Sequence, residues 1–169
     1  MNQPGLLLML LLLALVVPLF SEENLTGMAK ALWLVLHVLI IAGIAFPIML
    51  VLDLLWLGTV GSGFYKSQLG SMLRPDVIWP AALAFYVIFA LAVAFFVIVP
   101  GIEAQSLLRI VLTAAFFGLA VYAAYDLTNL ATLTGWPLPL TLVDLAWGMT
   151  VTVLTSVGTY LVATRLLGY

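Results

Sequence analysis

Three aspartates lie inside apolar segments of this chain, where a charged side chain is costly. Asp126 falls in the stretch YAAYDLTNLATLTGWP (residues 122–137), which gathers an aspartate, an asparagine and three threonines within an apolar sequence. A carboxylate at bilayer depth costs about 2.5 to 3.5 kcal/mol on insertion scales. Asp53, Asp126 and Asp144 must therefore be shielded, paired or protonated, and such residues are often functional.

Asp126 has polar neighbours on its own helix face, because Tyr122 and Asn129 lie at positions i−4 and i+3. We predict that Asp126 is an acid or base, oriented by Asn129, and that like-charge repulsion from Asp53 and Asp144 raises its proton affinity. An oxygen-ligand site for a hard cation stays open as another use of these carboxylates. The candidate catalytic residues are Asp126 and Asn129, and the candidate binding residues are Asp53, Trp56, Tyr122, Asp144 and Trp147.

Two of the aspartates share a short pattern, LDLLWLG at residues 52–58 and VDLAWG at residues 143–148. In each, a tryptophan follows the aspartate by three residues, so both side chains share a helix face. This echo is consistent with a pseudo-symmetric pair of helices. The other aromatic residues at this end are expected to form an interfacial belt: Tyr65, Trp79 and Trp136.

Asp126 and Asp144 also have structural interpretations. Thr141 and Asp144 form a T-x-x-D pattern, which at a helix start is typical of a capping box. A protonated Asp126 bonded to Asn129 or to a neighbouring side chain could take part in a polar helix–helix contact. Either arrangement would satisfy a carboxylate without any ligand.

Asp53 is harder to explain structurally, because an anion near a helix C-terminus faces the negative end of the helix dipole. Its structural interpretation is an ion pair with Lys66 or Arg74 from the following loop.

Composition identifies an integral membrane protein, since 66% of residues are apolar and only 7% are charged. A length of 169 residues allows four or five spans of ~20 residues and no separate soluble domain. Runs of this length without alternation exclude a barrel, so the fold class is all-α, a polytopic transmembrane helix bundle. The predicted spans are residues 31–57, 77–99, 108–134 and 141–164, with a kink at Pro47 and with Pro100 closing the second span.

The apolar run at residues 5–20 is predicted to form one short extra N-terminal helix rather than a signal peptide, because no Lys or Arg precedes it. The predicted organisation is therefore an extra apolar segment at residues 1–27 and a four-helix transmembrane domain at residues 28–169.

Alternating crossings predict that the three aspartates meet at one membrane face. His37, the only histidine, lies ~24 Å from Asp53 along one helix, which excludes a Ser-His-Asp triad and a zinc site with imidazole ligands. The chain has no cysteine, no phosphate-binding loop and no dinucleotide fingerprint, so we expect no cofactor. The few scattered Lys and Arg residues make nucleic acid an unlikely partner by composition.

Four strings together resemble a family of small bacterial membrane proteins, the domain of unknown function 2177 family. They are LDLLWLG, GFYKSQLG at residues 63–70, YDLTNLATLTGWP at residues 125–137 and TLVDLAWG at residues 141–148. The resemblance implies a four-helix core in the bacterial inner membrane and no established activity. Family genes often lie beside enzymes of fatty-acid modification, which implies work on or near membrane lipids.

Two function classes remain open. One is a site that binds or processes a lipid or small molecule, with Asp126 as its acid or base. The other is a structural accessory subunit that packs against a larger membrane complex or another copy of itself, with the polar residues only locking its helices. A proton-coupled transporter is a weaker third idea, because four helices are few for alternating access.

Overall fold

The structure is a computed structural model that describes residues 27–169, and this part of the chain is helical with no strand. The extra helix predicted before residue 27 lies outside the described residues. Four helical segments are long and apolar enough to cross a membrane, which confirms the predicted four-helix core. These segments are Gly27–Thr59, Trp79–Glu103, Leu107–Thr132 and Leu138–Leu166.

The first span continues past its predicted end. Helix α2 (Gly27–Leu55) runs through Pro47 into a π-helical segment, Trp56–Val60, and then into α3 (Gly61–Leu69). The loop predicted after residue 57 is thus mostly helical. Its glycines do not end the helix, because the wider π-helical turn lets the backbone change direction while its hydrogen bonds continue.

The second span also continues through its expected stop. Helix α4 (Trp79–Val93) leads into a π-helical segment, Ala94–Ile98, and then into α5 (Val99–Glu103), so Pro100 does not close the span. Proline removes one backbone N–H and crowds the preceding turn. The π-helical turn just before it, closed by the Val99 N–H bonding to the Ala94 carbonyl, provides room for the ring.

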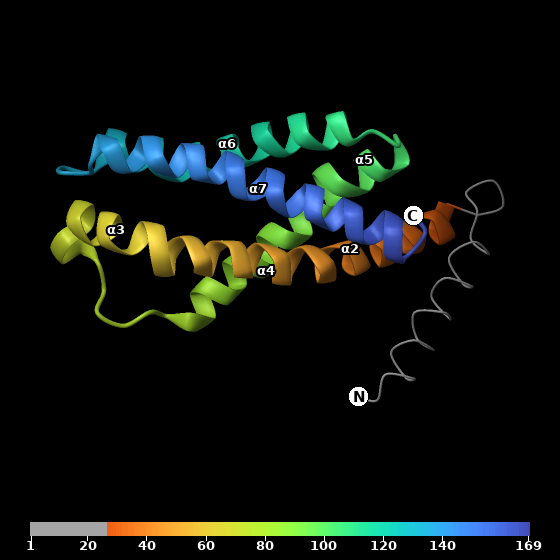
Figure 1. Ribbon diagram of the computed structural model, residues 1–169, viewed down its shortest axis with the longest axis horizontal. Helices are drawn as coiled ribbons and strands as arrows, with labels where there is room; N and C mark the ends of the chain where they lie inside the picture. Colours follow the sequence, from red (N-terminus) through yellow and green to blue (C-terminus); the bar gives the residue numbers. More distant parts are fainter. Residues whose placement is uncertain (1–26) are drawn as a thin grey trace.

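The last two spans are α6 (Leu107–Thr132) and α7 (Leu138–Leu166), which pack closely along their length (Figure 1). The Ser106 hydroxyl accepts a hydrogen bond from the Arg109 N–H, 3.2 Å away, and so caps α6. Close approach depends on glycine, since a Cβ at Gly118 would lie 2.2 Å from the Gly148 carbonyl oxygen.

The four spans do not pack equally. Helix α2 packs against both α7 and α4, while α6 meets the second span mainly at its π-helical segment and α5. In Figure 1 the second span crosses the bundle diagonally, from the lower edge at the start of α4 to the upper edge at α5. Helices α4 and α6 therefore diverge toward the end of the bundle that carries the aspartates.

Candidate functional site

The three aspartates lie at one level of the bundle. Asp53 and Asp126 precede the ends of their spans, Thr59 and Thr132, by six residues, and Asp144 follows Leu138 by six. At 1.5 Å per residue each lies ~9 Å inside its helix end. The crossings alternate, so all three ends are at the same end of the bundle. The role of these residues as a functional site stays a prediction.

Asp53 is buried and held by neutral donors from two other helices. Its carboxylate accepts hydrogen bonds from the Tyr86 hydroxyl on α4 and from the Trp147 indole Nε1 on α7, the latter at 2.9 Å. The predicted ion pair with Lys66 or Arg74 is wrong, since each Asp53 oxygen bonds to one of these neutral donors instead. Neutral donors satisfy the carboxylate without bringing a second costly charge into the apolar bundle.

Asp144 is held in a similar way from α3, the helix that follows the first span. The Tyr65 hydroxyl on α3 donates to Asp144 and accepts a hydrogen bond from the Trp56 indole Nε1 at 3.1 Å. Burial and the bond to Asp144 raise the pKa of the Tyr65 hydroxyl well above its usual value. Tyr65 therefore stays a proton donor to Asp144 at any physiological pH.

The capping box predicted for Thr141 and Asp144 is not formed. Helix α7 begins at Leu138 and its N-cap, Pro137, has no capping side chain. Because the helix starts three residues before Thr141, that residue is inside it, and its hydroxyl accepts from the Trp136 indole at 3.1 Å.

The two Asp-x-x-Trp patterns are linked reciprocally across α2 and α7. Asp53 of the first bonds directly to Trp147 of the second, and Asp144 of the second bonds through Tyr65 to Trp56 of the first. The two indole rings stack with centroids 4.4 Å apart and an interplanar angle of 10°. The sequence echo thus corresponds to a closed network that fixes two aspartates and ties two spans together.

Tyr65 reaches this network because of local backbone features. The π-helical segment that begins at Trp56 leads directly into α3, and α3 contacts α7. A Cβ at Gly61 would lie 2.7 Å from the Tyr65 ring and 3.2 Å from the Trp56 Nε1 atom. Glycine at this position therefore allows the tyrosine ring to lie against the indole.

Asp126 differs from the other two aspartates. Its side chain is fully buried, and neither carboxylate oxygen has a hydrogen-bond partner in the described part of the chain. Asp144 lines the same pocket as Asp126. Because every oxygen of a buried carboxylate needs a donor or a proton, Asp126 is the one aspartate whose bonding is incomplete.

Asn129 does not supply a hydrogen bond to Asp126. The alternative in which Asp126 bonds to Asn129 is wrong, since both Asp126 oxygens are unpartnered. Asn129 lies on the same helix face but is only half-buried, closer to the end of α6. Its predicted orienting role stays a prediction.

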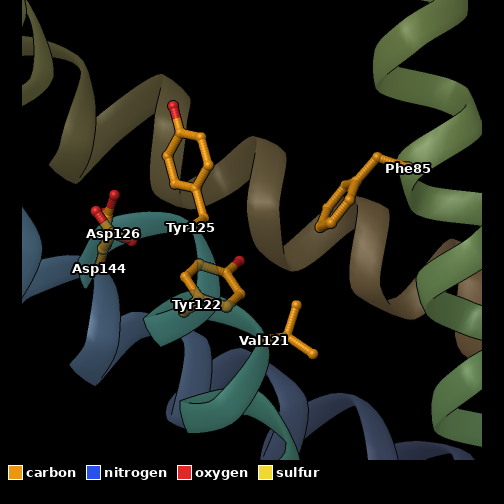
Figure 2. A pocket seen from close by; sticks show the side chains of 6 residues that line it. All are labelled: Phe85, Val121, Tyr122, Tyr125, Asp126 and Asp144. Atoms are coloured by element: carbon orange, nitrogen blue, oxygen red, sulfur yellow. The ribbon is translucent and has the colours of Figure 1, made fainter. Parts of the chain in front are cut away.

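A pocket of about 460 Å³ opens beside Asp126 between α4, α6 and α7. Figure 2 shows Asp126 and Asp144 at one end, Tyr122 and Tyr125 along the wall, and Phe85 of α4 facing them across the space. The pocket is thus polar at one end and apolar at the other. Its lining residues are Phe85, Val121, Tyr122, Tyr125, Asp126 and Asp144.

The pocket opens sideways rather than only toward a helix end. Two of its lining residues lie on the outer surface of the bundle, where Phe85 is 42% and Tyr125 is 60% exposed. In a membrane that surface faces lipid. The divergence of α4 and α6 therefore opens the pocket laterally toward the bilayer.

Sequence reasoning did not identify several residues of this region. Tyr65 was expected in an interfacial belt, but it bonds to Asp144. Phe85, Tyr86 and Tyr125 were not singled out. A phenol hydroxyl within an otherwise apolar span was the available signal for Tyr86, because such a group needs a partner in lipid.

The other titratable candidate lies far from the pocket. His37 is buried near the opposite end, where its Nδ1 lies 2.7 Å from the Trp33 carbonyl and its ring packs edge-on against Tyr169. Within residues 27–169, no three His, Cys, Asp or Glu side chains lie close enough together to hold a metal ion.

Four apolar spans around buried, hydrogen-bonded carboxylates define a polytopic helical membrane protein. The chain belongs to the family described as predicted membrane protein (DUF2177), which matches residues 35–161 and so covers most of the chain. The family resemblance seen in the sequence is thereby confirmed. No curated protein and no solved structure matches the chain.

Proposed function

We propose that the protein binds a lipid or other amphiphilic small molecule in the pocket between α4, α6 and α7, and that Asp126 is the acid–base group that acts on it. The observation that carries the proposal is the incomplete bonding of Asp126 in the pocket wall. A carboxylate that only tied helices together would have donors, as Asp53 and Asp144 do. An unsatisfied buried carboxylate costs stability, and such a cost is typical of a group kept for a ligand.

The lateral opening supports a ligand that arrives from the membrane. Phe85 and Tyr125 lie at the lipid-facing rim, and the pocket is of the size that holds small organic ligands. An apolar tail could enter between α4 and α6 while a polar group reaches Asp126. The network of Asp53, Trp147 and their partners holds α7, which contributes Asp144 to the pocket, against α2.

The test is complementation of a deletion strain by Asp126→Asn, with a melting curve of the purified variant in mild detergent. Asparagine keeps the size of the side chain but cannot exchange a proton. We expect a folded variant that fails to complement. Glu103→Gln is the matched control, because it neutralises an exposed carboxylate at the opposite end of the second span and should complement fully.

The same experiment separates the structural alternative. If Asp126→Asn folds and complements fully, Asp126 has no acid–base role and the proposal is wrong. Co-purification of a stoichiometric partner polypeptide with that competent variant would then identify an accessory subunit. If Asp126→Asn folds but fails to complement while Glu103→Gln complements, the result supports the proposed site.

A further inference from the structure

The charges around the pocket restrict what can bind there. Two carboxylates line it, and no Lys, Arg or His side chain of residues 27–169 does. Arg74 lies in a neighbouring groove on the far side of Tyr125, together with Asp76. An anionic headgroup in the pocket would meet two like charges, with no lining cation to balance them.

The bonding of the two carboxylates indicates what is missing. Asp144 receives one donor from Tyr65, and Asp126 receives none. A bound group that brings both positive charge and hydrogen-bond donors would satisfy Asp126 and relieve its repulsion with Asp144. A protonated amine has both properties, a quaternary ammonium brings the charge without a donor, and a hydroxyl brings a donor but no charge.

The aromatic walls favour an organic cation over a metal ion. Phe85, Tyr122 and Tyr125 present rings to the pocket, and ring faces attract ammonium groups. A metal ion requires about six oxygen ligands if it is calcium or magnesium, and two carboxylates in an aromatic pocket of about 460 Å³ do not supply them.

We infer that the ligand is an amphiphilic organic cation, an amine or quaternary ammonium group on an apolar tail. The inference rests on the proposed function and specifies its ligand class. The cationic head lies between Asp126 and Asp144, and the tail passes Val121 and Phe85 into the bilayer, following the polar-to-apolar direction of the pocket.

The test measures calorimetric binding of probes with one chain length to the full chain in a neutral maltoside detergent. The probes are dodecyltrimethylammonium, dodecylamine, dodecanol and dodecyl sulfate, with the ionic probes below their micellar concentrations. Dodecylphosphocholine is added to distinguish a zwitterionic lipid headgroup from a free amphiphilic amine. We expect both cations to bind at least about tenfold tighter than dodecanol, a difference of about 1.4 kcal/mol.

Variants test the assigned contacts. Asp126→Asn should weaken the binding of dodecyltrimethylammonium at least about tenfold and leave the binding of dodecanol unchanged, because only the cation interacts with the carboxylate charge. Glu103→Gln removes the same charge outside the pocket and should change neither probe. Phe85→Leu keeps an apolar wall but removes a ring, so it should weaken the quaternary probe severalfold. If Asp126→Asn does not fold, Asp144→Asn takes its place with the same expectation.

Each outcome decides something. Equal or tighter binding of dodecanol or dodecyl sulfate overturns the cation inference but leaves the proposed amphiphile site standing. Failure of every probe to bind contradicts the proposed function itself. Cation binding that survives Asp126→Asn and Asp144→Asn equally places the cation elsewhere and overturns the inference. Binding of dodecylphosphocholine as tight as that of the cations identifies a lipid headgroup as the source of the ammonium.

Discussion

Asp53→Asn and Asp126→Asn are the same chemical change at one level of the bundle, and we predict that only Asp53→Asn lowers stability. Asp53 accepts bonds from Tyr86 and Trp147, whereas Asp126 accepts none. Replacing Asp53 therefore removes satisfied interactions. Replacing Asp126 removes a charge that no donor in the described structure compensates.

The magnitudes follow from these contacts. Hydrogen bonds to charged groups contribute ~1.5 to 3 kcal/mol in water-soluble proteins, and those between membrane helices average ~0.6 kcal/mol. Because the asparagine oxygen keeps one of the two donors of Asp53, we expect Asp53→Asn to lower the free energy of unfolding by about 1 to 2 kcal/mol. Relief of the carboxylate insertion cost should make Asp126→Asn neutral or more stable by up to about 2 kcal/mol.

The assay is reversible unfolding in mixed micelles, titrated with dodecyl sulfate and followed by far-ultraviolet circular dichroism. The two variants should move the midpoint in opposite directions from the wild type, or Asp53→Asn alone should move it. Glu103→Gln serves as the control for removing an exposed carboxylate. A loss of stability in Asp126→Asn as large as that in Asp53→Asn would refute the distinction, because it would mean that Asp126 also holds the helices together.

Three further changes are measured by the same titration. Tyr65→Phe should lower stability by about 1 to 2 kcal/mol, since it deprives Asp144 of its donor, and an unchanged midpoint would contradict the network. Gly148→Ala should cost about 1 to 3 kcal/mol, because its Cβ would lie 2.3 Å from the Tyr122 Cγ atom; a neutral result would show that α6 and α7 can separate freely. Ser106→Ala should cost about 0.5 to 2 kcal/mol through loss of the α6 cap, while Ser106→Thr should keep most of it.

The helical architecture could be predicted because the bilayer imposes it. An apolar run of about 20 residues must satisfy its own backbone, so length and composition identify the spans. Their ends were less predictable. Pro100 and the glycines after residue 57 are usual helix terminators, but π-helical segments at Trp56–Val60 and Ala94–Ile98 carry the chain past both. Such segments have no composition signal of their own.

The depth of the three aspartates could also be predicted, because consecutive spans cross the membrane in alternating directions. Their hydrogen-bond partners could not. The alternation of spans gives the depth of a residue along its helix but does not say which side chain of a neighbouring helix faces it. Tyr86 and Tyr65 reach Asp53 and Asp144 only because α4 and α3 pack at particular rotations. Opposite charges in the nearest loop seemed the natural partners for Asp53, yet neutral phenol and indole groups bind it, since they bond without adding a charge to an apolar interior.

The hydrogen-bonded aspartates, Asp53 and Asp144, help to explain how the fold tolerates the unpartnered Asp126. The exchanged bonds of Asp53 and Asp144, with the stacked indoles of Trp56 and Trp147, fix α2 against α7 at the level of the pocket. The hydrogen bonds of this network stabilise the bundle without Asp126. The fold can therefore tolerate the free-energy cost of an unsatisfied carboxylate beside them. None of these bonds involves a residue of α6, the helix that carries Asp126. The helices are therefore tied together independently of Asp126, which is what the proposed role of its carboxyl group requires.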